Sequence, residues 1–141
     1  MKVVVDASLV VPYFLPERFS QAASRWLAGG HDVIAPDLLT IEAGNVLWKK
    51  ARLGNVTVAD AEEILGRIAD GAVQLRPSNP LARVAWRLAT ELDHPIYDCF
   101  YLALAVTEDS RLVTADRRFH QRVAAGPLAG RIGWVEDPPP A

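Results

Sequence analysis

The sequence of 141 residues has one cysteine, no long apolar run and no histidine cluster. The lone Cys99 excludes an internal disulfide framework and favours a reducing compartment. His31, His94 and His120 are far apart in the chain, which argues against a structural zinc site. The residues after Lys2 do not resemble a signal peptide, and no segment is apolar for long enough to span a bilayer. We therefore expect a cytoplasmic protein without a membrane partner.

An excess of basic residues is also lacking, because 15 Lys and Arg stand against 17 Asp and Glu. Nucleic-acid binders usually have a basic balance. However, four of the acids, Asp6, Glu42, Asp98 and Asp116, lie where apolar runs meet helices or turns. Without these four, thirteen acids stand against fifteen bases, so the remaining chain is mildly basic. A polyanionic substrate is compatible with this balance if metal ions screen the four acids.

Short apolar strands alternate with helices along the whole chain. Strands are expected at residues 2–5, 33–35, 73–75, 111–114 and 132–135, with helices at 8–15, 16–28, 37–52, 57–70, 78–92, 97–106 and 117–125. This alternation predicts one α/β domain over residues 1–136, with a short central parallel sheet flanked by helices on both faces. The Pro-rich residues 137–141 are expected to form a mobile tail. Ligands of such sheets bind beyond the carboxyl ends of the strands, where Asp6 and Asp116 are expected to lie.

Each of the four acids has a second interpretation that involves no chemistry. Asp6, Asp98 and Asp116 each precede a predicted helix, and aspartate is a favoured N-cap residue. Glu42 lies one turn into its helix, where a solvated face is the alternative. Asp98 heads the most apolar helix, where an unpaired charge costs several kcal/mol, as an order of magnitude. Capping and solvation therefore explain Glu42 and Asp98 less well than the other two.

Four carboxylates without a cysteine or histidine ligand suit a hard cation, which indicates Mg²⁺ or Mn²⁺. Such ions promote phosphodiester hydrolysis by stabilising the charge that develops on oxygen. We assign Asp6 and Asp98 as the main ligands, with Glu42 and Asp116 completing the shell or acting through water. Asn45, one turn beyond Glu42, is predicted to orient it by a hydrogen bond, and local satisfaction of a polar side chain is the alternative.

Four segments around these acids share the motifs of one known family. They are Asp6-Ala7-Ser8 after the first strand, Glu42 followed by Asn45-Val46-Leu47, Pro95-Ile96-Tyr97-Asp98 leading into Tyr101-Leu102-Ala103-Leu104-Ala105, and Thr114-Ala115-Asp116 with Phe119. In this order and spacing, nearly the whole chain resembles PIN-domain nucleases, and most closely the VapC-type ribonuclease toxins of bacterial toxin–antitoxin pairs.

The resemblance implies an endoribonuclease with a Mg²⁺ or Mn²⁺ cofactor. It implies that Asp6, Glu42, Asp98 and Asp116 surround the metal, with the hydroxyl groups of Ser8 and Thr114 beside them. Two arginines that follow Asp116 are candidates to contact RNA phosphates at the mouth of the site, although adjacent helix residues point in different directions. These are Arg117 and Arg118, and a solvated surface pair is their alternative.

The resemblance also implies partners besides RNA. A small cognate antitoxin is expected to cover the active-site groove, and the chain is expected to form a homodimer, or a heterotetramer or larger complex with the antitoxin. We place the groove between the first two helices, where an excess of apolar residues is found, with ordinary core as the alternative. These residues are Val10, Val11, Phe14, Leu15, Phe19 and Trp26.

Other functions remain as alternatives. One is a PIN-domain RNA-processing nuclease without an antitoxin, and another is a non-enzymatic α/β binding module such as a response receiver. Receivers need paired acids after the first strand and a lysine near the last strands, but no lysine follows Lys50. A phosphatase with a nucleophilic Asp6 usually needs a second aspartate two residues later, where this chain has Ser8. Neither a receiver nor a phosphatase explains Glu42 together with Asp98.

Overall fold

The computed structural model describes residues 1–140. Their strands are β1 (Lys2–Val5), β2 (Asp32–Pro36), β3 (Gln74–Arg76), β4 (Arg111–Thr114) and β5 (Ile132–Trp134). The helices are α1 (Ala7–Phe14), α2 (Ser20–Leu27), α3 (Leu38–Arg52), α4 (Val58–Arg67), α5 (Ala82–Leu92), α6 (Ile96–Thr107) and α7 (Arg117–Ala124). Shorter helical turns are Ile68–Ala72, Asn79–Leu81 and Ala129–Arg131. The tail predicted at residues 137–141 ends at Ala141, which lies outside the described residues.

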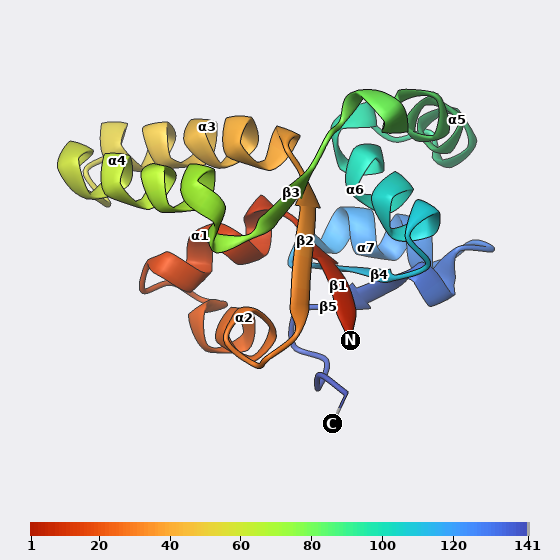
Figure 1. Cartoon of the computed structure of the whole chain (residues 1–141), viewed down its shortest axis with the longest axis horizontal. Coiled ribbons are helices and arrows are strands. Elements are labelled where there is room, and N and C mark those ends of the chain that lie inside the picture. The colour runs from red at the N-terminus through yellow and green to blue at the C-terminus, as the bar shows by residue number, and fades with distance from the viewer. Residues whose placement is uncertain (141) are drawn as a thin grey trace.

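The strands form one parallel sheet in the order β3-β2-β1-β4-β5. In the central strand, Val3 pairs with Val33 of β2 on one side and with Arg111 of β4 on the other. Right-handed crossovers place the helices that follow β1 and β2 on one face and those that follow β3 and β4 on the other. Figure 1 shows α1 to α4 on one side of the sheet and α5 to α7 on the opposite side. The predicted α/β architecture is confirmed.

The core surrounds the central strand and α6. Val3, Val4 and Val5 are all fully buried, because helices cover both faces of the strand. The sequence of a strand that is covered on both faces is a continuous apolar run rather than an alternating pattern, and Val3, Val4 and Val5 form such a run. Each such buried valine contributes about 1.5–3 kcal/mol of hydrophobic stabilisation. The core thereby holds rigidly the end of β1, from which Asp6 emerges.

The second helix begins later than its sequence suggested. Pro16 was expected in its first turn, whereas α2 starts at Ser20. The Ser20 hydroxyl accepts a hydrogen bond from the Glu17 backbone N–H at 2.8 Å and donates to the Leu15 carbonyl. These contacts stabilise a turn between the helices, so Pro16 belongs to the turn that separates α1 from α2.

The apolar groove expected between the first two helices is not present, because its central residues belong to the core. Val10, Val11 and Trp26 are at most 2% exposed, since α1 packs against α2, α3 and the sheet. The Trp26 indole donates to the Val135 carbonyl at 3.0 Å, which attaches α2 to the end of the sheet. The alternative interpretation as ordinary core is correct for these three residues, and the other three, Phe14, Leu15 and Phe19, pack partly buried against the same core.

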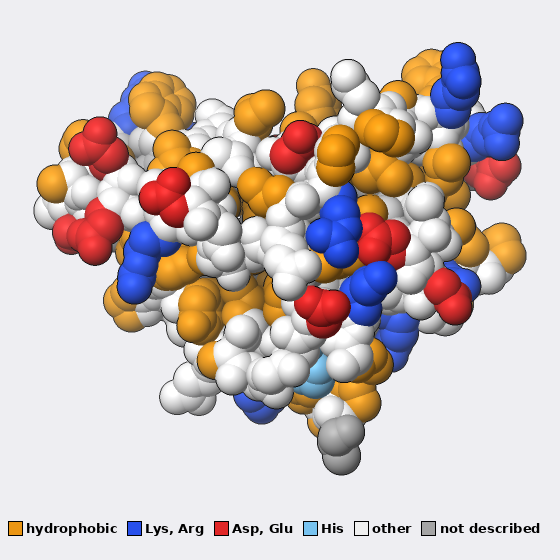
Figure 2. Space-filling model, viewed as in Figure 1, with side chains coloured by type: hydrophobic (Ala, Val, Ile, Leu, Met, Phe, Trp, Pro, Cys, Tyr) orange, Lys and Arg blue, Asp and Glu red, His pale blue; other side chains and the backbone are white. Residues whose placement is uncertain are grey.

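The surface carries charges of both signs. Figure 2 shows acidic and basic side chains interleaved over one face rather than gathered by sign. Ion pairs contribute to this pattern, since Glu108 binds Lys2 and Arg76, each at 2.9 Å. The mild basic excess outside the four acids therefore forms no single basic patch on this face. None of the helices within residues 1–140 has the length and apolar character that a bilayer span requires.

Candidate active site

The predicted acidic residues gather at the carboxyl edge of the sheet. Asp6 directly follows β1, and Asp116 lies two residues beyond β4, its neighbour in the sheet. β1 leads into α1 on one face, whereas β4 leads into α7 on the other, so the chain diverges here (Figure 1). Asp98 belongs to the first turn of α6, and Glu42 to the second turn of α3. In open α/β sheets, a crevice at such a switch point is the usual ligand site.

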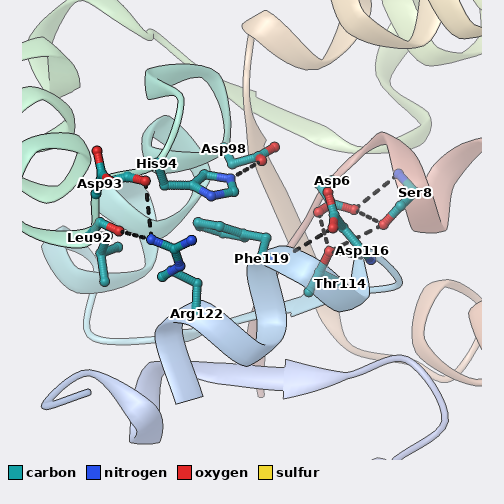
Figure 3. Close-up of polar contacts among 10 residues, drawn as sticks. All are labelled: Asp6, Ser8, Leu92, Asp93, His94, Asp98, Thr114, Asp116, Phe119 and Arg122. Carbon is teal, nitrogen blue, oxygen red and sulfur yellow. Dashed lines mark hydrogen bonds and ion pairs between the residues drawn. The ribbon is translucent and has the colours of Figure 1, made fainter. Parts of the chain in front are cut away.

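Asp6 is a buried carboxylate with hydroxyl groups on both of its oxygens (Figure 3). Oδ1 accepts from the Ser8 hydroxyl and from the Ser8 backbone N–H at 3.0 Å, while Oδ2 accepts from Thr114 Oγ1 at 2.6 Å. The Ser8 hydroxyl oxygen also accepts from the Ala115 backbone N–H at 2.8 Å, and Thr114 Oγ1 accepts from the Asp116 backbone N–H at 3.0 Å. Through these contacts, Asp6 joins the β1–α1 turn to the β4–α7 turn.

The pKa of Asp6 is raised from 3.8 to about 7. Burial is the main cause and the charge of Asp98 adds to it, whereas the hydrogen bonds from Ser8 and Thr114 lower the pKa. A carboxyl group whose pKa is raised in this way ionises more readily when a positive charge lies nearby. The environment of Asp6 therefore favours binding of a cation.

We expect Thr114→Val to lower the free energy of unfolding by about 1–3 kcal/mol, because valine keeps the shape but loses a buried hydroxyl that both donates and accepts. Thr114 is fully buried, so water cannot replace the hydroxyl. Urea denaturation measures the change. The exposed Thr107→Val at the end of α6 is the matched control. Equal stability of the two variants would contradict the role given to Thr114.

The capping interpretation is correct for two of the three aspartates. Asp6 caps α1 through the Ser8 N–H, and Asp116 caps α7 by accepting from the Phe119 N–H at 3.1 Å. Each caps a helix while it lies at the switch point, so capping and a role in the site are compatible. Asp98 does not cap its helix.

Asp98 lies inside the first turn of α6, because Pro95 is the N-cap residue and the helix begins at Ile96. Its side chain is 30% exposed, and Oδ2 lies 2.6 Å from Nε2 of His94. Burial raises the pKa of Asp98, the His94 hydrogen bond lowers it, and the charge of Asp116 raises it again. The charges of Asp6, Asp98 and Asp116 therefore act on one another across the crevice.

Glu42 faces the same crevice from α3. Burial raises its pKa and so does the charge of Asp98, whereas the nearby Tyr101 hydroxyl lowers it. Tyr101 is 1% exposed, and within residues 1–140 its hydroxyl forms no hydrogen bond. Burial, then the charges of Glu42, Asp6 and Asp98, raise the pKa of this phenol, which stays neutral. The hydroxyl lies close to Glu42 without reaching good hydrogen-bond geometry, and a further polar group would satisfy it.

A groove of about 560 Å³ adjoins this acidic centre. Its apolar residues Ile41 and Tyr97 are 72% and 61% exposed, although both are large. Ala7 and Tyr97 line the groove and are the sequence neighbours of Asp6 and Asp98, so the groove opens beside these acids. The remaining lining residues come from α3 and are Leu38, Glu42, Asn45 and Val46. The open groove therefore lies between α1, α3 and α6.

The other predicted residues lie near the site without contacting the acids. Asn45 is exposed and lines the groove, but the expected hydrogen bond to Glu42 is not formed among the described residues. Arg117 and Arg118 are both exposed, and the Arg117 guanidinium lies over the Trp134 ring, 4.4 Å from its centroid.

The chemistry of these residues fits a divalent cation. Carboxylate oxygens are the ligands that Mg²⁺ and Mn²⁺ prefer. The raised pKa values of Asp6, Glu42 and Asp98 indicate a centre short of positive charge, and the Tyr101 hydroxyl forms no hydrogen bond with any residue that the structure describes. In residues 1–140, no three acidic, histidine or cysteine side chains are grouped closely enough to make a complete metal cluster. Asp6, Asp98 and Asp116 are instead each held by hydrogen bonds of their own.

Comparison with known proteins identifies the fold family. The PIN domain family model matches residues 3–125. The chain belongs to the PIN domain family. This PIN domain is 31% identical over 127 residues to Ribonuclease VapC3 of Pyrobaculum aerophilum, a match that covers 89% of the chain and 97% of that relative. The resemblance to PIN-domain, VapC-type proteins is thereby confirmed.

Two solved structures share the PIN fold. PAE2754 from Pyrobaculum aerophilum superposes with a TM-score of 0.72 at 28% identity, covering 96% of this chain and 90% of that one. A toxin–antitoxin complex from Klebsiella pneumoniae gives a TM-score of 0.61 at 15% identity, covering 93% and 95%. Because the identity is only 15%, the similarity to the Klebsiella pneumoniae structure shows a shared fold and nothing more.

Sequence reasoning missed two residues of the acidic centre. His94 was considered only as an isolated histidine, and because it precedes α6, helical spacing does not relate it to Asp98. Tyr101 was noted within a motif, and its position one turn after Asp98 placed it on the same side of the helix. Only for Tyr101 did helical spacing from Asp98 carry the information, whereas the His94 contact depends on tertiary packing against Phe119.

Proposed function

We propose that this PIN domain protein is a divalent-metal-dependent endoribonuclease and the toxin of a VapBC-type toxin–antitoxin pair. The observation that carries the proposal is Asp6, a buried carboxylate with a raised pKa at the switch point of the sheet, facing the charges of Asp98 and Asp116. Similarity to a relative named as a ribonuclease supports RNA as the substrate.

In this proposal, Asp6 and Asp98 hold the cation, while Glu42 and Asp116 complete its surroundings directly or through water. A bound Mg²⁺ or Mn²⁺ would stabilise the negative charge that develops on the phosphodiester and its departing oxygen. The hydroxyl of Thr114, together with that of Ser8, keeps Asp6 pointing into the crevice. The protein thus supplies a fixed set of oxygen atoms, and its contribution to the reaction is mainly positioning.

We also propose that basic side chains near the crevice contact RNA phosphates. Arg117 and Arg118 follow Asp116 at the start of α7. Both side chains are exposed, and the Arg117 guanidinium packs on Trp134, so each can reach a bound strand from the start of α7. Such contacts position a nucleic acid without reading its sequence.

The purified protein is expected to open a circular RNA in Mg²⁺ or Mn²⁺ and to leave it intact in EDTA. A circle has no ends, so its linearisation on a denaturing gel reports internal cleavage. Cleavage in EDTA would contradict the role of the metal. If a linear RNA is shortened from its ends while the circular RNA stays intact, the protein is an exonuclease rather than an endonuclease.

The groove beside the acidic centre is the proposed site of the antitoxin. Ile41 and Tyr97 offer an antitoxin segment apolar surface at the mouth of the crevice, and the acids favour a basic side chain on that segment. The fold is shared with a protein solved as part of a toxin–antitoxin complex. The proposed assembly is a homodimer, or a heterotetramer or larger complex with the antitoxin, which light scattering can measure.

We expect Ile41→Ala to weaken binding of the antitoxin encoded beside this chain about tenfold, since a central apolar contact typically contributes more than 1 kcal/mol. Calorimetric titration measures the affinity. Leu53→Ala is the matched control, because Leu53 is 75% exposed just beyond the opposite end of α3. Equal affinities of the two variants would place the antitoxin elsewhere. If the protein cleaves RNA and no protein encoded beside it inhibits the cleavage, the alternative of an RNA-processing nuclease without an antitoxin is favoured.

A further inference from the structure

The hydrogen bond between His94 and Asp98 belongs to a network that reaches from α5 to α7 (Figure 3). The His94 side chain is 5% exposed, and its Nε2 lies 2.6 Å from Asp98 Oδ2. This is the only hydrogen bond to the Asp98 side chain found in residues 1–140. Oδ1 of the same carboxylate therefore remains available to a ligand while Oδ2 is occupied.

The ring of His94 is held by α7. Its centroid lies 4.6 Å from that of Phe119, with 37° between the ring planes. Phe119 is fully buried, and its backbone N–H donates to Asp116 at 3.1 Å. The residue that supports His94 is therefore the one whose backbone orients Asp116. Through this contact, acids from α6 and from the start of α7 share one support.

The backbone that carries His94 is fixed as well. Asp93 ends α5 in the left-handed region at φ 50, and the His94 N–H donates to the Ala89 carbonyl at 3.1 Å. Arg122 of α7 donates from Nη1 to the carbonyls of Leu92 at 2.8 Å and Asp93 at 3.2 Å. These contacts satisfy carbonyls at the end of α5 that the helix itself leaves without partners. Little freedom remains for the His94 ring.

We propose that His94 is a positioning residue, which fixes the Asp98 carboxylate through Nε2 and thereby raises the affinity of the acidic centre for a divalent cation. The inference rests on the proposed function in one respect, that a divalent cation binds at this centre. An aspartate free to rotate must be ordered when the ion binds, whereas an aspartate held by His94 is already in place. Removal of a group that supports a metal ligand typically costs 10- to 100-fold in affinity or activity.

The test is a titration of the purified, full-length protein with Mn²⁺, in which electron paramagnetic resonance measures the free ion. We expect His94→Phe, which keeps an aromatic ring against Phe119 but removes the donor, to bind Mn²⁺ about 10- to 100-fold more weakly. His94→Gln retains an N–H donor and is expected to recover most of the affinity. At saturating Mn²⁺ the rate of RNA cleavage by His94→Phe is expected to approach that of the wild type.

His31→Phe is the matched control, because His31 packs on Trp26 as His94 packs on Phe119 and precedes β2 at the opposite edge of the sheet. Its Mn²⁺ affinity is expected to equal that of the wild type. A second variant, Arg122→Met, changes no residue that contacts the acids, and we expect it to weaken Mn²⁺ binding in the same direction but by less. It tests the network independently if His94→Phe fails to fold.

Wild-type affinity in both His94→Phe and Arg122→Met would overturn the inference. An equal loss in His94→Gln and His94→Phe would also overturn it, since packing rather than the hydrogen bond would then be responsible. A wild-type protein that binds Mn²⁺ but cleaves no RNA would contradict the proposed function while the affinities still decide the role of His94. A wild-type protein that binds no Mn²⁺ would overturn both.

Discussion

Replacing Asp98 with asparagine is expected to reduce metal-dependent RNA cleavage about a thousandfold. A cation at the acidic centre contributes several kcal/mol of charge stabilisation, and each 1.36 kcal/mol corresponds to about a factor of ten in rate. Asparagine removes the negative charge of one main ligand but keeps an oxygen that can accept the His94 hydrogen bond. The variant should therefore remain folded and lose activity through its chemistry.

The matched control for this variant is Asp109→Asn, which makes the same change just beyond the opposite end of α6. Asp109 has φ 50, a conformation that asparagine tolerates, and its ion pair with Arg131 is exposed. We expect Asp109→Asn to cleave RNA at the wild-type rate, measured as single-turnover cleavage at saturating Mg²⁺. Near wild-type cleavage by Asp98→Asn would show that Asp98 is not a ligand of the cation.

The architecture could be predicted because the central strands are buried on both faces. Val3 to Val5 and Leu112 to Thr114 are short apolar runs, each followed by an acid and a helix, and no other fold class accounts for several such units in a row. The parallel order places the ends of neighbouring strands together. Asp6 and Asp116 could thus be placed at one edge of the sheet without knowledge of any side-chain contact.

The exact role of Asp98 could not be predicted, because it depends on where the helix starts. The sequence placed the start near Tyr97 and left Asp98 open to interpretation as a cap, whereas Pro95 is the N-cap residue and Asp98 lies inside the first turn. The partner of Asp98 depends on tertiary structure too. His94 is held against Asp98 by Phe119, a residue 25 positions later in the chain.

The groove was misplaced for a related reason. A helix with apolar residues on every side looks like an interaction surface or like core, and the pattern alone does not distinguish the two. α1 proved to be enclosed by α2, α3 and the sheet, which buries Val10 and Val11. The exposed apolar residues that line the groove came from α3 and from the start of α6, where Ile41 and Tyr97 are each the sequence neighbour of an acid.

The burial that equips Asp6 to bind a cation also costs stability in the metal-free protein. In the unfolded chain Asp6 ionises near pH 3.8, whereas in the folded protein its pKa is about 7. Between these values the folded state holds a proton that the unfolded state has released. Stability therefore falls as pH rises toward 7 and is not reduced further by Asp6 above that pH. The burial that favours cation binding at Asp6 therefore lowers the free energy of unfolding of the metal-free protein near neutral pH.

We expect Asp6→Asn to lose RNA cleavage yet to gain stability relative to the wild type as pH rises. Asparagine does not titrate, so the difference in unfolding free energy should grow by about 3 kcal/mol, as an order of magnitude, between pH 5 and pH 8. Asp98 and Glu42 titrate in both proteins, so the difference mainly reports Asp6. Urea denaturation in EDTA measures it, and added Mg²⁺ should narrow the gap by stabilising only the wild type. Parallel pH profiles of the two proteins would contradict the raised pKa of Asp6.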